Sequence, residues 1–314
     1  MSRRVRVATR GSALARVQAE RVIERLGVAG ELVIVSTRGD QRTDVPIHTM
    51  GGTGVFVKEV EQALLDGRAD IAVHSAKDLP STTESGLRLA ALPERADPRD
   101  ALVGTTLAQL PTAARIGTGS VRRRAQLAHL RPDLLFGELR GNIPTRLEKA
   151  AGFDGVVLAA AGLDRLGLGD RIAERLDPAV LLPQVAQGAL AVECRADDEA
   201  TGALLAAIDD PEVRACVTAE RAFLTRLGGG CNLPCGALAH VVAGTVALEG
   251  MLASLDGRIA LRARGDGRDP DALGVEVAER LLDGHGGRLL LDDFVLASHS
   301  PDNPGPATQE RGVV

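Results

Sequence analysis

A lysine and an aspartate stand side by side directly after an apolar stretch of this 314-residue chain. The segment DIAVHSAKDLP predicts a buried strand that ends near His74, followed at once by Ser75, Lys77 and Asp78. In open α/β sheets, ligands bind beyond the carboxyl ends of the strands, so the Lys77–Asp78 pair is well placed for chemistry. An ordinary ion pair on a solvated loop is the alternative at this point.

A second segment, RIGTGSVRRR, predicts a strand that runs through a Gly-Thr-Gly-Ser turn into a helix opening with three arginines. Backbone N–H groups, hydroxyls and a helix N-terminus converge there, which is typical of an anion site. The turn is not a nucleotide loop, because it lacks GKS or GKT and Arg122 stands where the third glycine of GxGxxG belongs. Arginines in a first helical turn oppose the helix dipole unless an anion compensates them.

The same device occurs twice more, in LRGNIPTRL at 139–147 and in Arg10-Gly-Ser12. Three strand-to-helix turns that each hold arginine are expected to line one cleft between two α/β lobes. Arginine pairs with carboxylates through charge-assisted, often bidentate hydrogen bonds. The predicted ligand is therefore small, rigid and rich in carboxylates.

The segment RLGGGCNLPCG places Cys231 after three glycines and Cys235 four residues later. Zinc ligation, disulfide formation, nucleophilic catalysis and covalent attachment are the possible roles for such a thiol. The four cysteines, of which the others are Cys194 and Cys216, include one CxxxC but no CxxC pair and no HxxxH, which argues against zinc. A reducing compartment would oppose a disulfide.

The elements that must position these residues fall into two strand–helix alternations, which predict parallel α/β sheets. The first has strands at 5–9, 31–36 and 70–74 with helices at 15–26 and 56–64. Turn formers at 92–100 and 182–188 suggest linkers. The second alternation has strands at 101–103, 114–117, 134–139 and 155–159, and helices at 121–130, 144–151 and 170–176, followed by a strand at 189–194.

From Pro211 the pattern changes to a long helix at 212–227, strands at 237–243, 246–254 and 258–264, and a helix at 271–282. This order predicts an α+β domain with an antiparallel sheet. Residues 301–314 have the composition of a disordered tail.

Composition excludes several classes of protein. The net charge is −5, so general polyanion binding is not expected, although eight Lys or Arg stand against three Asp or Glu between Arg115 and Lys149. The chain has no Trp or Tyr and only five Phe, so stacking on nucleic-acid bases is not expected either. No apolar run approaches the ~18 residues of a membrane span. The N-terminal segment lacks a secretory h-region, so a cytoplasmic protein is expected.

Taken in order, the segments resemble hydroxymethylbilane synthase, also called porphobilinogen deaminase. The resemblance is carried by VATRGSALARVQA, STRGD, FVKEVEQALLDGRADIAVHSAKDLP, IGTGSVRRRAQL, LRGNIPTRL, VLAAAGLDRLG, AQGALAVECR and AERAFLTRLGGGCNLPCG. These blocks run from Val5 to Gly236, with weaker similarity beyond. The family joins four porphobilinogen molecules head to tail, releases ammonia each time, and frees the linear tetrapyrrole by hydrolysis.

The resemblance implies a dipyrromethane cofactor bound by a thioether to Cys231, whereas Cys235 lies outside the family pattern and is expected to be structural. It also implies that Asp78 is the catalytic aspartate, which stabilises the cation formed when porphobilinogen loses ammonia. Lys77 matches a residue that contacts the cofactor carboxylates. The remaining implied anion-binding and cleft positions are Arg10, Ser12, Thr118, Ser120, Arg122, Arg123, Arg140, Arg146, Gln187 and Arg221.

Three positions depart from the family pattern. Thr49 and Thr53 stand where some members have lysine, and Gly119 replaces a serine common in the turn. Neither kind of change touches Asp78 or Cys231.

The expected architecture has two α/β domains like those of periplasmic binding proteins, joined by a hinge, and a smaller α+β C-terminal domain. Domain 1 is expected at 1–93 and 189–207, domain 2 at 97–186, domain 3 at 212–300, and the tail at 301–314. A monomer without metal is the family's usual form. A two-lobed solute-binding module for a polycarboxylate is the alternative, although it would need an export signal and no reactive thiol.

Overall fold

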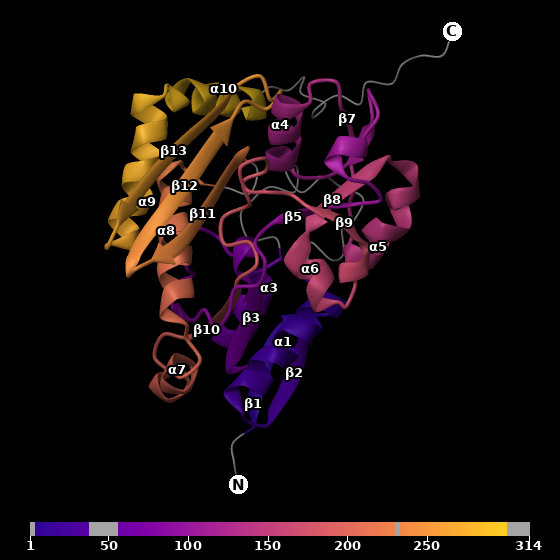
Figure 1. Ribbon diagram of the computed structural model, residues 1–314. Coiled ribbons are helices and arrows are strands. Elements are labelled where there is room, and N and C mark those ends of the chain that lie inside the picture. Colours follow the sequence, from indigo (N-terminus) through magenta and orange to yellow (C-terminus); the bar gives the residue numbers. More distant parts are fainter. Residues whose placement is uncertain (1–3, 38–55, 230–232, 300–314) are drawn as a thin grey trace.

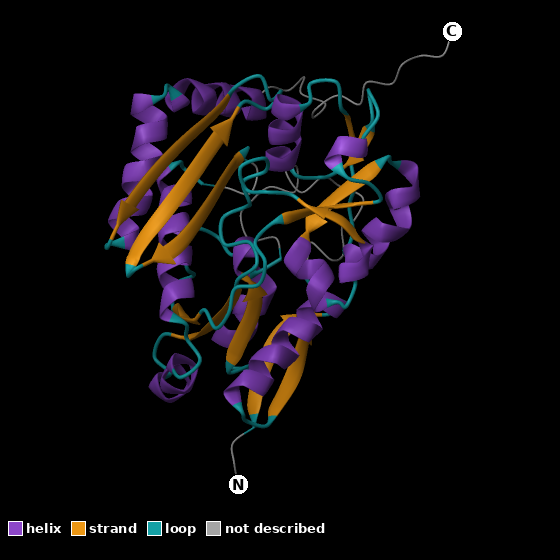
Figure 2. Ribbon diagram, viewed as in Figure 1, coloured by secondary structure: helices purple, strands orange, loops and turns teal. Residues whose placement is uncertain are grey.

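The computed structural model describes residues 4–37, 56–229 and 233–299. Cys231, Thr49, Thr53 and the tail at 301–314 therefore lie outside the described residues. Within the described part, the strands form two five-stranded sheets and one three-stranded sheet. Figure 2 shows these sheets as three separate groups of strands, each with its own helices.

The first sheet has the strand order β2-β1-β3-β10-β4. Its strands are β1 (Val5–Arg10), β2 (Gly30–Val35), β3 (Ile71–Ser75), β4 (Leu87–Ala91) and β10 (Leu190–Arg195). The helices beside it are α1 (Ala13–Leu26), α3 (Lys58–Leu65) and α7 (Glu199–Ala206). β10 returns from far along the sequence and pairs antiparallel with both β3 and β4.

Successive side chains of β3 point to opposite faces of the sheet, and helices cover both faces. Ile71 and Val73 pack in a core cluster with Val22 of α1. Ala72 packs in a different cluster with Leu64 of α3. A central strand buried on both faces reads as a continuous apolar run, as the sequence DIAVH does.

The second sheet has the order β7-β6-β8-β5-β9. Its strands are β5 (Asp100–Val103), β6 (Arg115–Gly117), β7 (Leu135–Gly137), β8 (Gly155–Ala159) and β9 (Ile172–Arg175). Its helices are α4 (Val121–Leu130), α5 (Ile143–Glu148) and α6 (Ala160–Arg165).

The predicted helix at 170–176 is wrong. Gly169–Arg171 forms a single 3₁₀ turn, and Ile172–Arg175 is an edge strand antiparallel to β5. Tertiary pairing with β5 decides the structure of a segment that is too short to hold a helix by propensity alone. The predicted parallel pairs are present, and β10, β5 and β9 add antiparallel pairs to the two sheets.

The third sheet is the antiparallel sheet predicted for the C-terminal region. It consists of β11 (Cys235–Val242), β12 (Thr245–Ala253) and β13 (Ala260–Gly267). The helices α8 (Pro211–Arg226) and α9 (Pro270–Glu279) pack against it, and α9 runs into a π-helical turn (Arg280–Gly284) and α10 (Gly287–His299).

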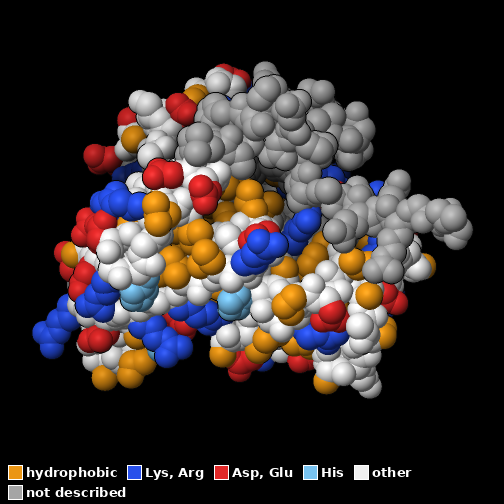
Figure 3. All heavy atoms as spheres, turned by 90° about the horizontal axis from the view of Figure 1, so that it is seen from above, with side chains coloured by type: hydrophobic (Ala, Val, Ile, Leu, Met, Phe, Trp, Pro, Cys, Tyr) orange, Lys and Arg blue, Asp and Glu red, His pale blue; other side chains and the backbone are white. Residues whose placement is uncertain are grey.

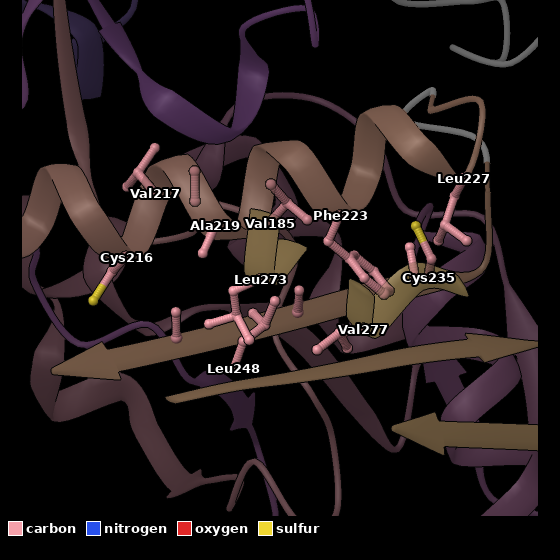
Figure 4. Packing of buried hydrophobic residues seen from close by; sticks show 14 of the residues in the cluster. Val185, Cys216, Val217, Ala219, Phe223, Leu227, Cys235, Leu248, Leu273 and Val277 are labelled. Atoms are coloured by element: carbon pink, nitrogen blue, oxygen red, sulfur yellow. The ribbon is translucent and has the colours of Figure 1, made fainter. Parts of the chain in front are cut away.

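Phe223 of α8 is the largest fully buried side chain of this region and lies close to Leu273 and Val277 of α9 (Figure 4). A side chain at position 250 would come within 2.3 Å of its ring, so Gly250 on β12 makes room for Phe223. The same cluster includes Val185 of the linker segment. The C-terminal domain is thereby packed onto the linker between the two lobes.

None of the described helices has the length and hydrophobicity to cross a membrane. The described residues also contain no group of three or more His, Cys, Asp and Glu side chains arranged to hold a metal ion. On the face shown in Figure 3, basic and acidic side chains are interspersed with hydrophobic ones rather than gathered by sign.

Candidate active site

Lys77 and Asp78 lie on a single 3₁₀ turn, Ala76–Asp78, that follows β3 directly. The turn is held from two sides. The Gln18 side chain of α1 donates to Ser75 Oγ at 2.9 Å, and the Ala76 backbone N–H donates to the Ala189 carbonyl at 3.0 Å. The pair is thus fixed at the carboxyl end of a buried strand, where the sequence predicted it.

A pocket of roughly 650 Å³, its open mouth included, begins at this turn. All three structural units contribute to its lining, which includes Lys77, Asp78, Ser120, Arg122, Gln184, Val185, Arg221, Gly229, Leu233 and Cys235. The first lobe therefore supplies the carboxylate, while the second lobe and α8 supply guanidinium groups. A pocket that combines separated positive groups with one acid suits a ligand that carries several negative charges.

The arginine-bearing turns share one construction, in which a side-chain oxygen caps the following helix. Ser12 Oγ accepts from the Ala15 N–H at 3.3 Å at the start of α1, and Ser120 Oγ accepts from the Arg123 N–H at 3.5 Å at the start of α4. Such caps satisfy N–H groups that have no partner inside the helix. Each cap fixes the direction in which its neighbouring arginine leaves the turn.

Asp100, the first residue of β5, compensates the two arginines in the first turn of α4. Its carboxylate is completely buried. Oδ1 accepts from Arg123 Nε at 2.9 Å and Arg123 Nη2 at 2.7 Å, and Oδ2 lies 2.8 Å from Arg122 Nη2. The conflict between these arginines and the helix dipole is thus relieved by a carboxylate of the chain itself.

Arg122 still has unused hydrogen-bonding capacity. Its Nη1 donates to the Leu182 carbonyl at 2.7 Å, but Nε has no hydrogen-bond partner among the described residues, although the side chain is only 3% exposed. Buried donors are nearly always paired in native proteins. Because Arg122 also lines the pocket, a ligand carboxylate would satisfy it.

The charges around the pocket shift one another's pKa values. Burial alone would raise the pKa of Asp100, but Arg122 and Arg123 lower it to about 2. Burial lowers the pKa of Lys77 to about 8, with Asp78 opposing this effect. Burial and the nearby Arg123 lower the pKa of Arg146 to about 10.

The other predicted residues lie at varying distances from this centre. The Arg221 guanidinium lines the pocket and donates to the Ser81 carbonyl at 3.0 Å. Arg10 stacks over the Phe56 ring at 4.2 Å, and Arg146 Nε donates to the Gly141 carbonyl at 2.7 Å. The described lining includes none of Arg10, Ser12, Thr118, Arg123, Arg140, Arg146 and Gln187.

Comparison with known families identifies the chain. The model of the porphobilinogen deaminase dipyrromethane cofactor binding domain matches residues 5–203, and the model of the porphobilinogen deaminase C-terminal domain matches residues 214–283. The chain belongs to the porphobilinogen deaminase family.

Curated relatives agree with this membership. A porphobilinogen deaminase from Roseiflexus sp. (strain RS-1) is 51% identical over 296 residues, which is 91% of this chain and 97% of that protein. One from Moorella thermoacetica is 49% identical over 298 residues, covering 91% of this chain and 95% of that protein.

The solved structures that match the chain are much more distant in sequence. An arginine-specific periplasmic binding protein from Salmonella typhimurium has a TM-score of 0.37 and 13% identity, covering 66% of this chain and 92% of that one. An ancestral cationic amino acid solute binding protein has a TM-score of 0.40 and 14% identity, covering 65% and 87% of the two chains.

Two buried carboxylates that organise the surroundings of the pocket were missed by the sequence analysis. Asp100 was read as part of a turn-rich linker, because nothing local distinguishes RADPRD from any other boundary. Glu220 was read only as a helical residue, yet its carboxylate accepts from Arg95 Nη1 at 2.6 Å and from the N–H groups of Ala186 and Ala239, at 2.6 and 2.7 Å. The partners of both acids are distant in sequence.

Cys235 has both a structural and a pocket environment. It is buried in the hydrophobic cluster around Phe223, and it also lines the pocket beside Lys77 and Asp78. Gly229 and Leu233, which flank the segment at 230–232, line the pocket as well. The chain therefore enters and leaves that segment at the pocket.

Proposed function

We propose that the pocket beside Lys77 and Asp78 is the active site at which this chain condenses four porphobilinogen molecules head to tail and releases hydroxymethylbilane. The chain is then a transferase of porphyrin biosynthesis, in line with its family. The observation that supports this site most strongly is that one pocket is lined by Asp78, by Arg122 with its unpaired buried Nε, and by both flanks of the segment that holds Cys231.

The described residues fit a dipyrromethane cofactor attached to Cys231. The cofactor's pyrrole rings carry carboxylates, and the pocket offers Arg122, Arg221 and Lys77 as positive partners. When bound, the group supplies the terminal pyrrole ring to which substrate is joined. Arg123 and Arg140 are proposed to hold carboxylates in the same cleft, with Thr118 and Ser120 as hydroxyl donors.

Asp78 is proposed to act on the substrate when ammonia leaves. The loss of ammonia converts porphobilinogen into a delocalised cation, and a carboxylate held beside the pyrrole N–H stabilises that charge as it forms. The rigid 3₁₀ turn keeps Asp78 in position, so little reorganisation is needed. Lys77 beside it binds a carboxylate without competing for the developing cation.

Arg10, Ser12, Arg146, Gln187 and Arg221 are proposed to bind the carboxylates of incoming porphobilinogen. Arg146 interacts electrostatically with Asp78, which supports a position near the reacting centre. The domain boundaries proposed from the sequence, 1–93 with 189–207, 97–186 and 212–300, agree with the grouping of the strands into three sheets.

A cytoplasmic monomer without a nucleic-acid or membrane partner is the proposed form of the protein. The solute-binding alternative is less favoured, because the family models and curated relatives match an enzyme over most of the chain.

Intact-protein mass spectrometry tests the attachment. Purified protein is expected to exceed its sequence mass by two pyrrole units, and Cys231→Ser is expected to lack this excess. Cys235→Ser is the matched control, because it removes a pocket-lining thiol four residues away and should keep the adduct. An adduct that survives in Cys231→Ser but disappears in Cys235→Ser would move the attachment to the other cysteine.

A further inference from the structure

We propose that Asp100 is a positioning residue of this active site, an internal carboxylate that holds Arg122 directly, and Lys77 through Gln187, in position to bind the carboxylates of bound pyrroles. This inference rests on the proposed function, and it adds a residue from outside the sequence-predicted set.

The carboxylate of Asp100 organises side chains from three separate segments. It binds Arg122 and Arg123 of α4 in the second lobe, and its Oδ1 also accepts from Gln187 Nε2 of the linker at 3.0 Å. Gln187 Nε2 donates in addition to the Pro98 carbonyl at 2.7 Å. The orientation of the Gln187 amide is therefore fixed, with its oxygen left as an acceptor.

That oxygen connects the network to the first lobe. Lys77 Nζ donates to Gln187 Oε1 at 3.2 Å, so a continuous chain of contacts runs from Lys77 through Gln187 to Asp100 and Arg123. The segments that carry these residues are far apart in sequence and belong to both lobes. Asp100 thus couples the turn that holds the catalytic aspartate to the arginines of the second lobe.

Charge balance explains why the network would attract an anion. Two guanidinium groups share one buried carboxylate, and the described residues provide no second carboxylate in contact with either of them. Buried charges are costly unless they are paired. Removing the carboxylate would leave Arg122 and Arg123 as adjacent like charges, which would repel each other and turn away from their present directions.

Asp100 also influences the protonation of Lys77. Asp78 and Asp100 favour the charged form of Lys77, whereas Arg123, Arg146 and burial disfavour it. The pKa of Lys77 is about 8 with Asp100 ionised. Loss of the Asp100 charge should lower it further, so that Lys77 would lose its proton at a lower pH.

The test is the isosteric variant Asp100→Asn, studied as purified holoenzyme with steady-state kinetics across pH. We expect KM for porphobilinogen to rise at least about tenfold and the alkaline limb of the kcat/KM profile to move to lower pH. A folded variant that fails to retain the cofactor would also support the proposal. Wild-type KM together with an unshifted alkaline limb would overturn it.

Asp97→Asn is the matched control. Asp97 lies in the same segment, pairs with Arg99 and Arg175 at 2.7 and 3.0 Å, and is not among the residues that line the pocket. It has no described contact with Arg122 or Arg123, so any loss of stability should leave KM and the pH limb unchanged. An equal effect of both variants would mean that Asp100 is merely structural.

A second variant, Asp100→Glu, keeps the charge and displaces the carboxylate by one methylene, so it remains informative if Asp100→Asn does not fold. We expect a raised KM with the alkaline limb where the wild type has it. Wild-type KM in this variant would refute positioning. Wild-type protein that carries the pyrrole adduct, together with Asp100 variants of wild-type KM and pH profile, would refute the positioning role of Asp100 and leave the proposed function standing. Wild-type protein without the adduct would instead refute the proposed function.

Discussion

At the residue scale, the proposed active site has one carboxylate that lines the pocket and another that does not. Asp78 lines the pocket, whereas Asp100 is completely buried behind Arg122 and Arg123. The first is the carboxylate proposed to stabilise a cation formed on the substrate. The second is occupied by the protein's own arginines, of which Arg122 keeps a buried Nε without a hydrogen-bond partner among the described residues.

Replacement of Asp78 by Ala is expected to lower kcat by at least ~10²-fold, which is typical when a group that stabilises transition-state charge is removed. Single-turnover and steady-state assays with porphobilinogen would measure the loss. Asp66→Ala, at the exposed end of α3, is the control and should retain wild-type rates. Near-normal turnover of Asp78→Ala would show that another group stabilises the cation.

The sequence predicted those candidate site residues that stand in a recognisable local pattern. Lys77 and Asp78 follow a strand, and Arg122 and Arg123 open a helix after a Gly-Thr-Gly-Ser turn, so type and position together indicate a site. Asp100 carries no such signal, because its partners Arg123 and Gln187 lie 23 and 87 residues away. Contacts between residues so far apart in sequence can be identified only from the three-dimensional structure.

At the element scale, α3 covers a group of buried ionisable side chains beneath the catalytic turn. His74 Nε2 of β3 lies 3.2 Å from Glu193 Oε2 of β10, and Glu61 of α3 is 3% exposed. Burial and the proximity of Glu193 raise the pKa of Glu61 to about 7. The protonated form is therefore favoured in the folded protein.

This shift makes the folding stability depend on pH. Below pH ~4 the Glu61 carboxyl is protonated in both folded and unfolded protein and contributes nothing. As pH rises to about 7, only the unfolded chain ionises freely, so stability falls, and the loss is complete above the folded pKa. Glu61→Gln should raise the midpoint of thermal unfolding at pH 8 more than at pH 5, as measured by calorimetry.

Glu24→Gln, on the exposed side of α1, is the control for this experiment and should give the same small change at both pH values. Equal effects of Glu61→Gln at pH 5 and pH 8 would contradict the raised pKa of Glu61.

Elements were predicted well where periodicity and length agreed, as in α8 and the three strands of the C-terminal sheet. The segment at 170–176 was predicted as a helix although Ile172–Arg175 completes the edge of the second sheet beside β5. Strand β4 (Leu87–Ala91) was not predicted, and it exists because β10 returns to pair with it. Both strands form because they pair with strands that are distant in sequence, and such pairing cannot be predicted from a local pattern.

At the scale of the whole molecule, Glu220 joins the C-terminal domain to the segments between the lobes. Its fully buried carboxylate binds Arg95 from the first crossing and the Ala186 N–H from the second, and it also accepts from Ala239 of β11. Three parts of the fold therefore share one acceptor group.

Glu220→Ala is expected to destabilise the protein by roughly 3–5 kcal/mol. It removes the acceptor of the buried Arg95 guanidinium and of two backbone N–H groups. Glu279→Ala is the matched control, since Glu279 pairs with Arg226 at 3.1 Å on an exposed surface, where a pair contributes ~1 kcal/mol or less. Chemical denaturation would measure both. Equal losses of unfolding free energy in the two variants would show that the Glu220–Arg95 pair contributes no more than a surface ion pair.

The shared acceptor has a consequence for how the enzyme lengthens its product. Because the Glu220 carboxylate binds β11 and both crossings, we expect β11 to move together with the crossings as one unit. With Cys231 as the proposed attachment site, we expect the second lobe to move away from this unit to make space for each added ring.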